Sequence, residues 1–545
     1  MRKQSPWLDE RVIVCDADVL VVDKPRGIAV HGGDEARADD VVHRLGAWLE
    51  ARGEPEYLGV HQRLDKEASG VLLFTRRREL NAAVARDMEG HAARRTYVAA
   101  VKDGGLAGKG TLEHLLAHDK GDKTRVVTRG GQRAVARYRV LARRHGRALV
   151  ELSPETGRTH QLRAQLAAVR SPIAGDRLYG GARANRLLLH ARALELPALG
   201  RRFECAVPES FREWLEHGEV GLGSAGAVAR GLADALCLRV ALASGATAYR
   251  LCNGAGDELP GVVVDRYGDF AVLAVSSDEA SSRVDEIAAL LVEHGARGVY
   301  LKRRERADQR KVDPEKTAPR EPIAGDAAPD ELLVTEGDLV FPVRLGDGLS
   351  TGLFVDQREN RALVRRCAKD ARVLNLFAYT CSFSLAAAAG GAREVVSVDL
   401  AEPALERGRR AFERNGLDPV THRFVQGDCV EWLGRARRKG ERFDLVILDP
   451  PSFGTRGRRA TFEVDRDLSA IAADALALLE PGGRLLGVTN HRKTSRERLR
   501  KILHDAARAA RVRVRQMKDL AAPIDCPDGP EGPSPAKSVL VTLDA

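Results

Sequence analysis

Between residues 371 and 489 the chain alternates short apolar runs with amphipathic stretches in a regular order. The apolar runs lie at 372–377, 395–399, 422–425, 443–449 and 485–489, and helices are expected near 403–415 and 465–479. Strands that alternate with helices predict a parallel, doubly wound sheet. A ligand of such a sheet binds beyond the carboxyl ends of its strands, near the point where the strand order reverses.

Acidic residues follow three of these expected strands. Asp399 is placed to bond a ribose diol, Asp428 could bind an adenine amino group, and Asp449-Pro450-Pro451 ends the fourth strand in a stiff loop. Each acid taken alone is as readily explained as a helix N-cap. Taken together, at successive strand ends, they resemble the class I S-adenosylmethionine methyltransferases.

A narrower resemblance covers the chain from about residue 247 to its end. The segments 259–267, 351–358 and 375–380 are similar to those of the 23S ribosomal RNA methyltransferases that make 5-methylcytosine. In the cofactor loop Cys381 stands where this subgroup tends to have Gly. The resemblance implies S-adenosyl-L-methionine as cofactor, bound by Gln357, Phe377, Tyr379, Thr380, Asp399, Asp428, Asp449 and Pro450.

The methylated atom depends on the segment after the fifth strand. Carbon 5 of cytosine becomes nucleophilic only after a thiolate adds to carbon 6, but Thr489-Asn490-His491 has no Cys where the cytosine enzymes carry one. This segment looks more like that of guanine-N7 relatives, whose acceptor needs only orientation towards the methyl group. We therefore favour guanine N7, with Asp449 and Asn490 near the base, and keep Cys526 as an alternative thiol.

The first two hundred residues carry a different pattern, centred on His61-Gln62-Arg63-Leu64-Asp65 and the small-residue turn Ala68-Ser69-Gly70. Asp65 lies on a loop directly before an apolar strand, a common place for a reactive group. A neighbouring Arg would keep the Asp ionised, as a carboxylate nucleophile requires. A surface salt bridge at a strand start is the alternative interpretation.

This pattern resembles the Arg-Leu-Asp signature of the RluA-type pseudouridine synthases, over about residues 10–215. Further motifs follow in order: Lys24-Pro25-Arg26-Gly27, Arg95-Thr96-Tyr97, the segments 156–163 and 172–176, and 187–191. Gln62 departs from the family, which usually has His directly before the signature. The resemblance implies that Asp65 attacks the target uridine, with Arg163 as its ion-pair partner. Tyr97 would stack on the flipped base, and Arg63 would fill the gap that the base leaves. This reaction needs no cofactor and no metal.

Composition limits the remaining possibilities. The 545 residues predict three or four domains, and 44% hydrophobic with 30% charged residues describes a soluble globular chain. The excess of 87 Lys and Arg over 77 Asp and Glu hints at a polyanionic partner. No two of the eight cysteines have C-x-x-C spacing. The absence of a signal segment and of a membrane-spanning apolar run favours the cytoplasm.

We therefore predict a multidomain α/β and α+β chain. A pseudouridine synthase domain with a mixed, partly antiparallel sheet spans 1–216, a linker 217–240, a small α/β domain 241–345 and a Rossmann-like methyltransferase domain 346–545. The predicted function is a bifunctional RNA modification enzyme that acts on RNA, preferably 23S rRNA, with tRNA as a second option. The alternatives are a methyltransferase half that only binds RNA, and an RNA-binding or ribosome-assembly protein.

Overall fold

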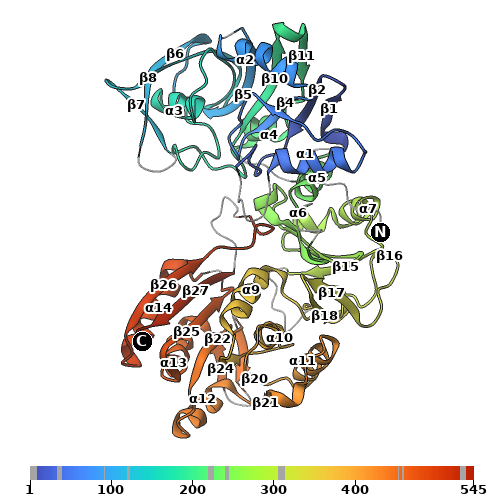
Figure 1. The fold of residues 1–545 in the computed structure, drawn as a ribbon, viewed down its shortest axis with the longest axis vertical. Coiled ribbons are helices and arrows are strands. Elements are labelled where there is room, and N and C mark those ends of the chain that lie inside the picture. The colour runs from blue at the N-terminus through green and yellow to red at the C-terminus, as the bar shows by residue number, and fades with distance from the viewer. Residues whose placement is uncertain are drawn as a thin grey trace.

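The computed structural model describes residues 9–32, 40–90, 92–119, 123–218, 222, 226–239, 245–304, 314–451, 453–456, 460–491, 493–527 and 536–545. Figure 1 shows three units along the long axis, with the N-terminal residues at one end, the methyltransferase-like residues at the other and a small unit between them. None of the helices in this part of the chain combines the length and the apolar character that crossing a bilayer requires.

The N-terminal unit is built on one mixed sheet in the order β1-β2-β4-β10-β5-β9-β8-β6-β7. Its pairs are antiparallel except β4 with β10, as the predicted mixed sheet requires. The strands are β1 (Val12–Cys15), β2 (Val19–Lys24), β3 (Gly59–Val60), β4 (Ser69–Thr75), β5 (Arg94–Lys102), β6 (Lys109–His118), β7 (Thr124–Val127), β8 (Gln132–Arg144), β9 (Arg147–Pro154), β10 (Leu189–Leu196) and β11 (Arg201–Glu204).

Four helices and three short 3₁₀ turns accompany this sheet. They are α1 (Val41–Glu50), α2 (Asn81–Glu89), α3 (Gln161–Ala168), α4 (Ser210–His217), η1 (Asp9–Arg11), η2 (Arg78–Leu80) and η3 (Pro197–Leu199). The strand β4 is buried along its whole length, because one face packs with α1 and the other with the α2 side of the sheet. The loop that carries Asp65 is therefore held by the most deeply buried strand of the unit.

The middle unit begins with a helix where the sequence predicted a linker. Helix α5 (Ala227–Arg239) packs Val228, Leu232 and Ala235 into the core of the middle unit, whereas Cys237 belongs to the core around α1. Because residues 217–240 are rich in Gly and Ala, the sequence did not predict this helix, which packs against two different cores. The linker expectation therefore differs from the structure at 227–239.

The middle sheet has the order β12-β13-β14-β15-β16. Its elements are β12 (Ala248–Asn253), η4 (Gly254–Asp257), β13 (Val262–Tyr267), β14 (Phe270–Val275), α6 (Asp278–Ser281), α7 (Val284–Glu293), β15 (Gly298–Arg303), α8 (Pro314–Thr317) and β16 (Ala324–Gly325). The hairpin β17 (Leu332–Glu336) and β18 (Leu339–Val343) packs its apolar residues into one core that contains residues of both the middle sheet and the C-terminal sheet. The hairpin thus links the middle unit to the unit that we expected to start at residue 346.

The C-terminal unit is the predicted doubly wound sheet. Its strand order is β21-β20-β19-β22-β25-β27-β26, with the first five parallel, and its order reverses at β19. The elements are η5 (Val355–Gln357), α9 (Arg358–Cys367), β19 (Arg372–Leu376), α10 (Ser382–Ala389), β20 (Glu394–Asp399), α11 (Glu402–Arg414), η6 (Pro419–Thr421), β21 (Arg423–Gln426), α12 (Cys429–Arg438), β22 (Phe443–Leu448), β23 (Phe453–Arg456), β24 (Ala460–Glu463), α13 (Val464–Leu476), β25 (Leu479–Thr489), α14 (Arg496–Ala509), β26 (Val514–Leu520) and β27 (Lys537–Leu543).

Candidate active sites

A cavity of about 700 Å³ opens in the N-terminal unit between the β3–β4 loop, β5 and α3. All four residues that the sequence singled out for this unit line it: Arg63, Asp65, Tyr97 and Arg163. His31, His61, Met88, Arg95, Arg158 and His160 are among the other lining residues. The site is therefore a polar pocket with Asp65 on one side and several basic side chains around it, and Glu89 also lines it.

The geometry of the β3–β4 loop is set where it enters β4. Gly70 has φ +116°, and a Cβ at this position would lie 2.2 Å from the carbonyl oxygen of Ala191 on the neighbouring strand β10. Only glycine fits both that backbone conformation and that approach. The small-residue turn after Asp65 thus lets β4 lie directly against β10 and fixes the end of the loop.

Arg163 links Asp65 to a second carboxylate. Its Nη1 donates to Asp65 Oδ2 at 3.3 Å, while Nε and Nη2 donate to the two oxygens of the buried Asp176 at 2.7 and 2.9 Å. The structure thus brings Asp65 and Arg163 together, and a third residue holds the guanidinium. The sequence contained Asp176 within a motif, but nothing in the motif alone assigned it this contact.

Tyr97 lies on β5, opposite Ala191 of β10 and Leu152 of β9. Burial raises the pKa of its phenol, with Asp65 adding to the effect and Arg95 opposing it. The phenol is therefore protonated at neutral pH, and its ring forms an apolar wall of the pocket. Such a wall can stack on a base, and its hydroxyl can donate or accept a hydrogen bond.

Lys24 is a residue whose role sequence reasoning missed. The side chain is fully buried, and its Nζ donates to the carbonyl oxygens of Pro25, Ile28 and Lys66 at 2.9, 2.9 and 3.1 Å. Burial lowers the pKa of this ammonium to about 7. Since Lys66 directly follows Asp65, Lys24 ties the end of β2 to the loop that carries the carboxylate.

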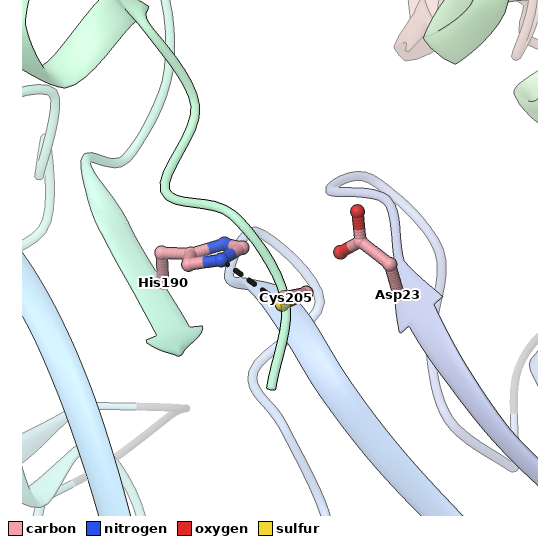
Figure 2. A group of neighbouring side chains, drawn as sticks. All are labelled: Asp23, His190 and Cys205. Atoms are coloured by element: carbon pink, nitrogen blue, oxygen red, sulfur yellow. Dashed lines mark hydrogen bonds between the residues drawn. The ribbon is translucent and has the colours of Figure 1, made fainter. Parts of the chain in front are cut away.

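Three side chains near this loop contain metal-binding atoms, but their surroundings do not fit a metal ion. Figure 2 shows Asp23 at the end of β2 beside His190 and Cys205, whose Nε2 and Sγ atoms lie 3.2 Å apart. Arg11 lies 3.5 Å from Asp23, and burial with Arg186 and Arg11 nearby lowers the pKa of His190 to about 3. Burial also raises the pKa of the Cys205 thiol. A protonated thiol beside arginines disfavours a cation, so the group is a hydrogen-bonded cluster.

The loop between β19 and α10 forms the second candidate site, at the point where the strand order reverses. Three of its non-glycine residues have positive φ, namely Phe377 at 56°, Tyr379 at 49° and Cys381 at 61°. Glycine adopts this conformation without strain, which explains why related loops favour it at the position of Cys381. The Cys381 side chain is buried against Gly408, where a Cβ would lie 2.6 Å from the sulfur.

Backbone groups of this loop contact the predicted cofactor residues. Tyr379 N donates to Asp399 Oδ2 at 2.8 Å, and Ala401 N donates to Asp399 Oδ1 at 2.9 Å. Asp428 caps α12 by accepting from the N–H groups of Val430 and Glu431. Both acids therefore have structural roles, and both keep lone pairs for a ligand, because a carboxylate offers about four acceptor sites.

The remaining predicted cofactor residues are more enclosed. Thr380 Oγ1 donates to the carbonyl oxygen of Gly352 at 2.5 Å, and the buried Gln357 accepts from Asn360 at 2.6 Å. The Phe377 N–H donates to the Cys429 sulfur at 3.3 Å, which accounts for Cys429 as a packing residue. These contacts fix the loop backbone, whereas the exposed ring of Phe354 lies against Tyr379 with centroids 5.9 Å apart.

The end of β22 carries a carboxylate with a strongly raised pKa. Burial, with Asp356 nearby and Arg361 opposing, raises the pKa of Asp449 to about 7. Burial also raises the pKa of Asp356, a residue that the sequence analysis did not select. Perturbed acids of this kind mark functional sites. Pro450 is buried after Asp449, and Asn490 is exposed at the end of β25.

Cys526 belongs to the same neighbourhood but is a poor nucleophile. The side chain is 1% exposed, and burial, with Asp525, Asp356 and Asp265 adding to the effect, raises the pKa of its thiol well above the usual value. A thiol that stays protonated cannot add to carbon 6 of a cytosine.

Comparisons with known proteins match both units. Residues 18–168 match the family model of RNA pseudouridylate synthases, and residues 303–540 match that of S-adenosylmethionine-dependent methyltransferases. The ribosomal RNA large subunit methyltransferase I of Erwinia tasmaniensis is 36% identical over 303 residues, which cover 55% of this chain and 74% of that protein. The enzyme of the same name from Aeromonas hydrophila is 36% identical over 294 residues, or 53% of this chain and 73% of that one.

Solved structures also match the C-terminal part of the chain. A protein described as a methyltransferase, complexed with SAH, has a TM-score of 0.52 at 29% identity and covers 58% of this chain and 82% of its own. One described as a SAM-dependent methyltransferase from Streptococcus mutans has a TM-score of 0.51 at 26% identity, with 63% and 84% covered.

Proposed function

We propose that both sites of this chain act on large-subunit ribosomal RNA, 23S rRNA. The chain belongs to the ribosomal RNA large subunit methyltransferase I family and also carries an RNA pseudouridylate synthase unit. The chain is a bifunctional RNA modification enzyme that isomerises uridine to pseudouridine and methylates an RNA base with S-adenosylmethionine. Its cysteines are free thiols, which supports a location in the reducing cytoplasm.

The Asp65–Arg163 contact at 3.3 Å carries the assignment of the first site. In this proposal the carboxylate of Asp65 attacks the target uridine, and the bond between nitrogen 1 of the base and the ribose breaks. The base rotates and rejoins the ribose through carbon 5, which releases Asp65. Carbon 5 loses its proton and nitrogen 1 gains one, so the product is an isomer of uridine. Arg163 orients the carboxylate through this hydrogen bond. Tyr97 stacks on the flipped base, and the exposed Arg63 fills the space that the base leaves in the RNA.

For the second site we propose that the β19–α10 loop holds the cofactor. Asp399 would accept from the ribose hydroxyls and Asp428 from the adenine amino group, with Phe377, Tyr379, Thr380 and Gln357 around them. S-adenosylmethionine, when bound, supplies an electrophilic methyl group. Asp449, Pro450 and Asn490 would face the target base.

Guanine N7 is the proposed acceptor atom. It needs no thiolate, and the thiol of Cys526, whose pKa Asp356 helps to raise, is buried and protonated. Methylation of N7 leaves a positive charge on the base, which the carboxylates of Asp449 and Asp356 can stabilise. The proposed domains are the synthase at 1–216, the middle unit at 241–345 and the methyltransferase at 346–545, with α5 between the first two.

A comparison of total RNA from a strain without the gene and from its parent tests the function. Digested nucleosides are measured by mass spectrometry, and pseudouridines are mapped chemically. The proposal expects 23S rRNA to lose one pseudouridine and one 7-methylguanosine. Loss of pseudouridine alone would mean that the methyltransferase unit only positions RNA or acts elsewhere.

A further inference from the structure

Beneath the Asp65 loop lies a group of four basic side chains, Arg11, Lys24, Arg26 and Arg186. Lys24 and Arg186 are almost fully buried, and Arg26 is 7% exposed. Burial lowers the pKa of Arg186, and Arg26 and Arg11 contribute to this effect. Such a cluster needs anions, because buried like charges repel strongly.

Two of the acids that meet this cluster come from outside the N-terminal unit. Asp234 of helix α5 pairs with Arg11. Glu258, which directly follows η4 of the middle unit, accepts from Arg26 Nε at 2.9 Å and lies 3.3 Å from Arg186 Nη1. Arg26 also donates to the carbonyl oxygen of Gly256. Glu258 therefore holds two cations of the synthase unit at once.

The backbone at Glu258 is strained. Its φ is +64° and its ψ is 14°, a left-handed conformation that favours glycine or asparagine. A long acidic side chain persists there only when its surroundings fix it. Its carboxylate is 13% exposed and is bonded at both of these arginines.

The two arginines reach the segment that follows Asp65, Arg186 directly and Arg26 through its neighbour in the chain. Arg186 Nη2 donates to Ser69 Oγ at 2.6 Å, next to Gly70, where the loop enters β4. Arg26 directly precedes Gly27, whose N–H donates to the carbonyl oxygen of Lys66 at 2.8 Å. Ser69 in turn contacts His190 of the cluster in Figure 2 at 2.9 Å. Glu258 thus reaches Ser69 through Arg186, and Lys66 through Arg26 and the adjoining Gly27.

The docking of the two units holds this arrangement in place. Arg44 of α1 donates to the carbonyl oxygens of Cys237 and Leu238 at the end of α5. Cys237 is part of the synthase core, and Leu238 lies against Gly27, 3.4 Å from the position of a Cβ there. Figure 1 shows α5 between the N-terminal and middle units.

We infer that Glu258 is a positioning residue for pseudouridine formation, supplied to the synthase unit by the methyltransferase side of the chain. It acts through Arg186, which bonds Ser69, and through Arg26, whose neighbour Gly27 bonds Lys66, so it supports the segment that directly follows Asp65. This inference rests on the proposed role of Asp65. It implies that the synthase site is complete only with the middle unit docked on it.

The experiment uses the purified full-length chain on total RNA extracted from a strain without the gene. Glu258→Gln removes the charge at nearly constant shape, and Glu293→Gln removes one at an exposed site of the same unit. Single-turnover pseudouridine formation at saturating RNA, RNA affinity and methyl transfer are measured. If Glu258→Gln displaces the loop, its single-turnover rate should fall about 10- to 100-fold. Its RNA affinity and methyl transfer should be unchanged, and Glu293→Gln should behave like the parent in all three measurements.

Glu258→Asp keeps the charge but shortens the side chain by one methylene, so its rate should fall between those of the parent and Glu258→Gln. This variant carries the test if Glu258→Gln does not fold. A parental rate in the variants overturns the inference, and so does a parallel loss of methyl transfer. If the parent chain itself makes no pseudouridine, the proposed function fails instead.

Discussion

Arg163 divides its guanidinium between two carboxylates, with two short hydrogen bonds to the buried Asp176 and one of 3.3 Å to the partly exposed Asp65. The backbone N–H groups of Leu178 and Tyr179 also donate to Asp176. The Arg163–Asp176 pair therefore fixes the guanidinium, and the weaker contact with Asp65 faces the cavity. This leaves Asp65 paired, yet accessible to a substrate.

Replacing Asp176 by Asn tests that support. The buried Arg163 would lose the more strongly bonded of its two carboxylate partners, and breaking such a buried pair costs about 3–5 kcal/mol. We expect lower stability in urea and a pseudouridine formation rate reduced by about 10-fold or more. Glu113→Gln, which breaks an exposed pair with Arg133, serves as the control. An unchanged rate in Asp176→Asn would show that Arg163 needs no such support.

Asp399→Ala tests the cofactor site. The change removes a carboxylate at the carboxyl end of β20, which we expect to weaken S-adenosylmethionine binding about 10-fold or more in calorimetry, as for a lost charge-assisted hydrogen bond. Asp418→Ala is the matched control, because Asp418 also accepts a backbone N–H but caps the exposed turn η6. Equal affinity of the Asp399 variant and the parent would remove Asp399 from the binding site.

The sequence predicted what depends on local pattern and order. The alternation of strands and helices gave the doubly wound sheet, and the acids do lie at the strand ends, Asp399 as the last residue of β20 and Asp449 directly after β22. It missed contacts that exist only after folding. Lys24 bonds Lys66 of the Asp65 loop, Glu258 pairs with Arg186 from another unit, and Asp356 contributes to the raised pKa of Asp449 although the two are far apart in the sequence. Helix α5 was not predicted, because its Ala- and Gly-rich sequence resembles a linker.

The pH dependence of methyl transfer should depend on Asp449. Because burial raises the pKa of Asp449 to about 7, the carboxyl is protonated below this pH and ionised above it. An ionised Asp449 stabilises the positive charge that methylation leaves on guanine. The single-turnover rate should therefore rise between about pH 6 and 8 and then level off. Asp449→Asn should be slow and independent of pH in this range; a flat profile of the parent would contradict the assignment.

Cys526→Ser separates the two acceptor atoms. A guanine-N7 reaction involves no thiolate, so methyl transfer should stay within about twofold of the parent, since a buried Cys acts mainly as a small packing residue. The measurement is the 7-methylguanosine content of the product RNA by mass spectrometry. Loss of activity in a stably folded variant, with 5-methylcytosine as the parental product, would establish the cytosine reaction instead.

The most direct test of a two-site enzyme is to complement the deletion strain with single-site variants and to measure both modifications on the same 23S rRNA. We expect Asp65→Asn to restore the methylated base without the pseudouridine, and Asp399→Ala to restore the pseudouridine without the methylated base. Pseudouridine restored by the Asp65→Asn chain would contradict the account, because that chain lacks the proposed nucleophile.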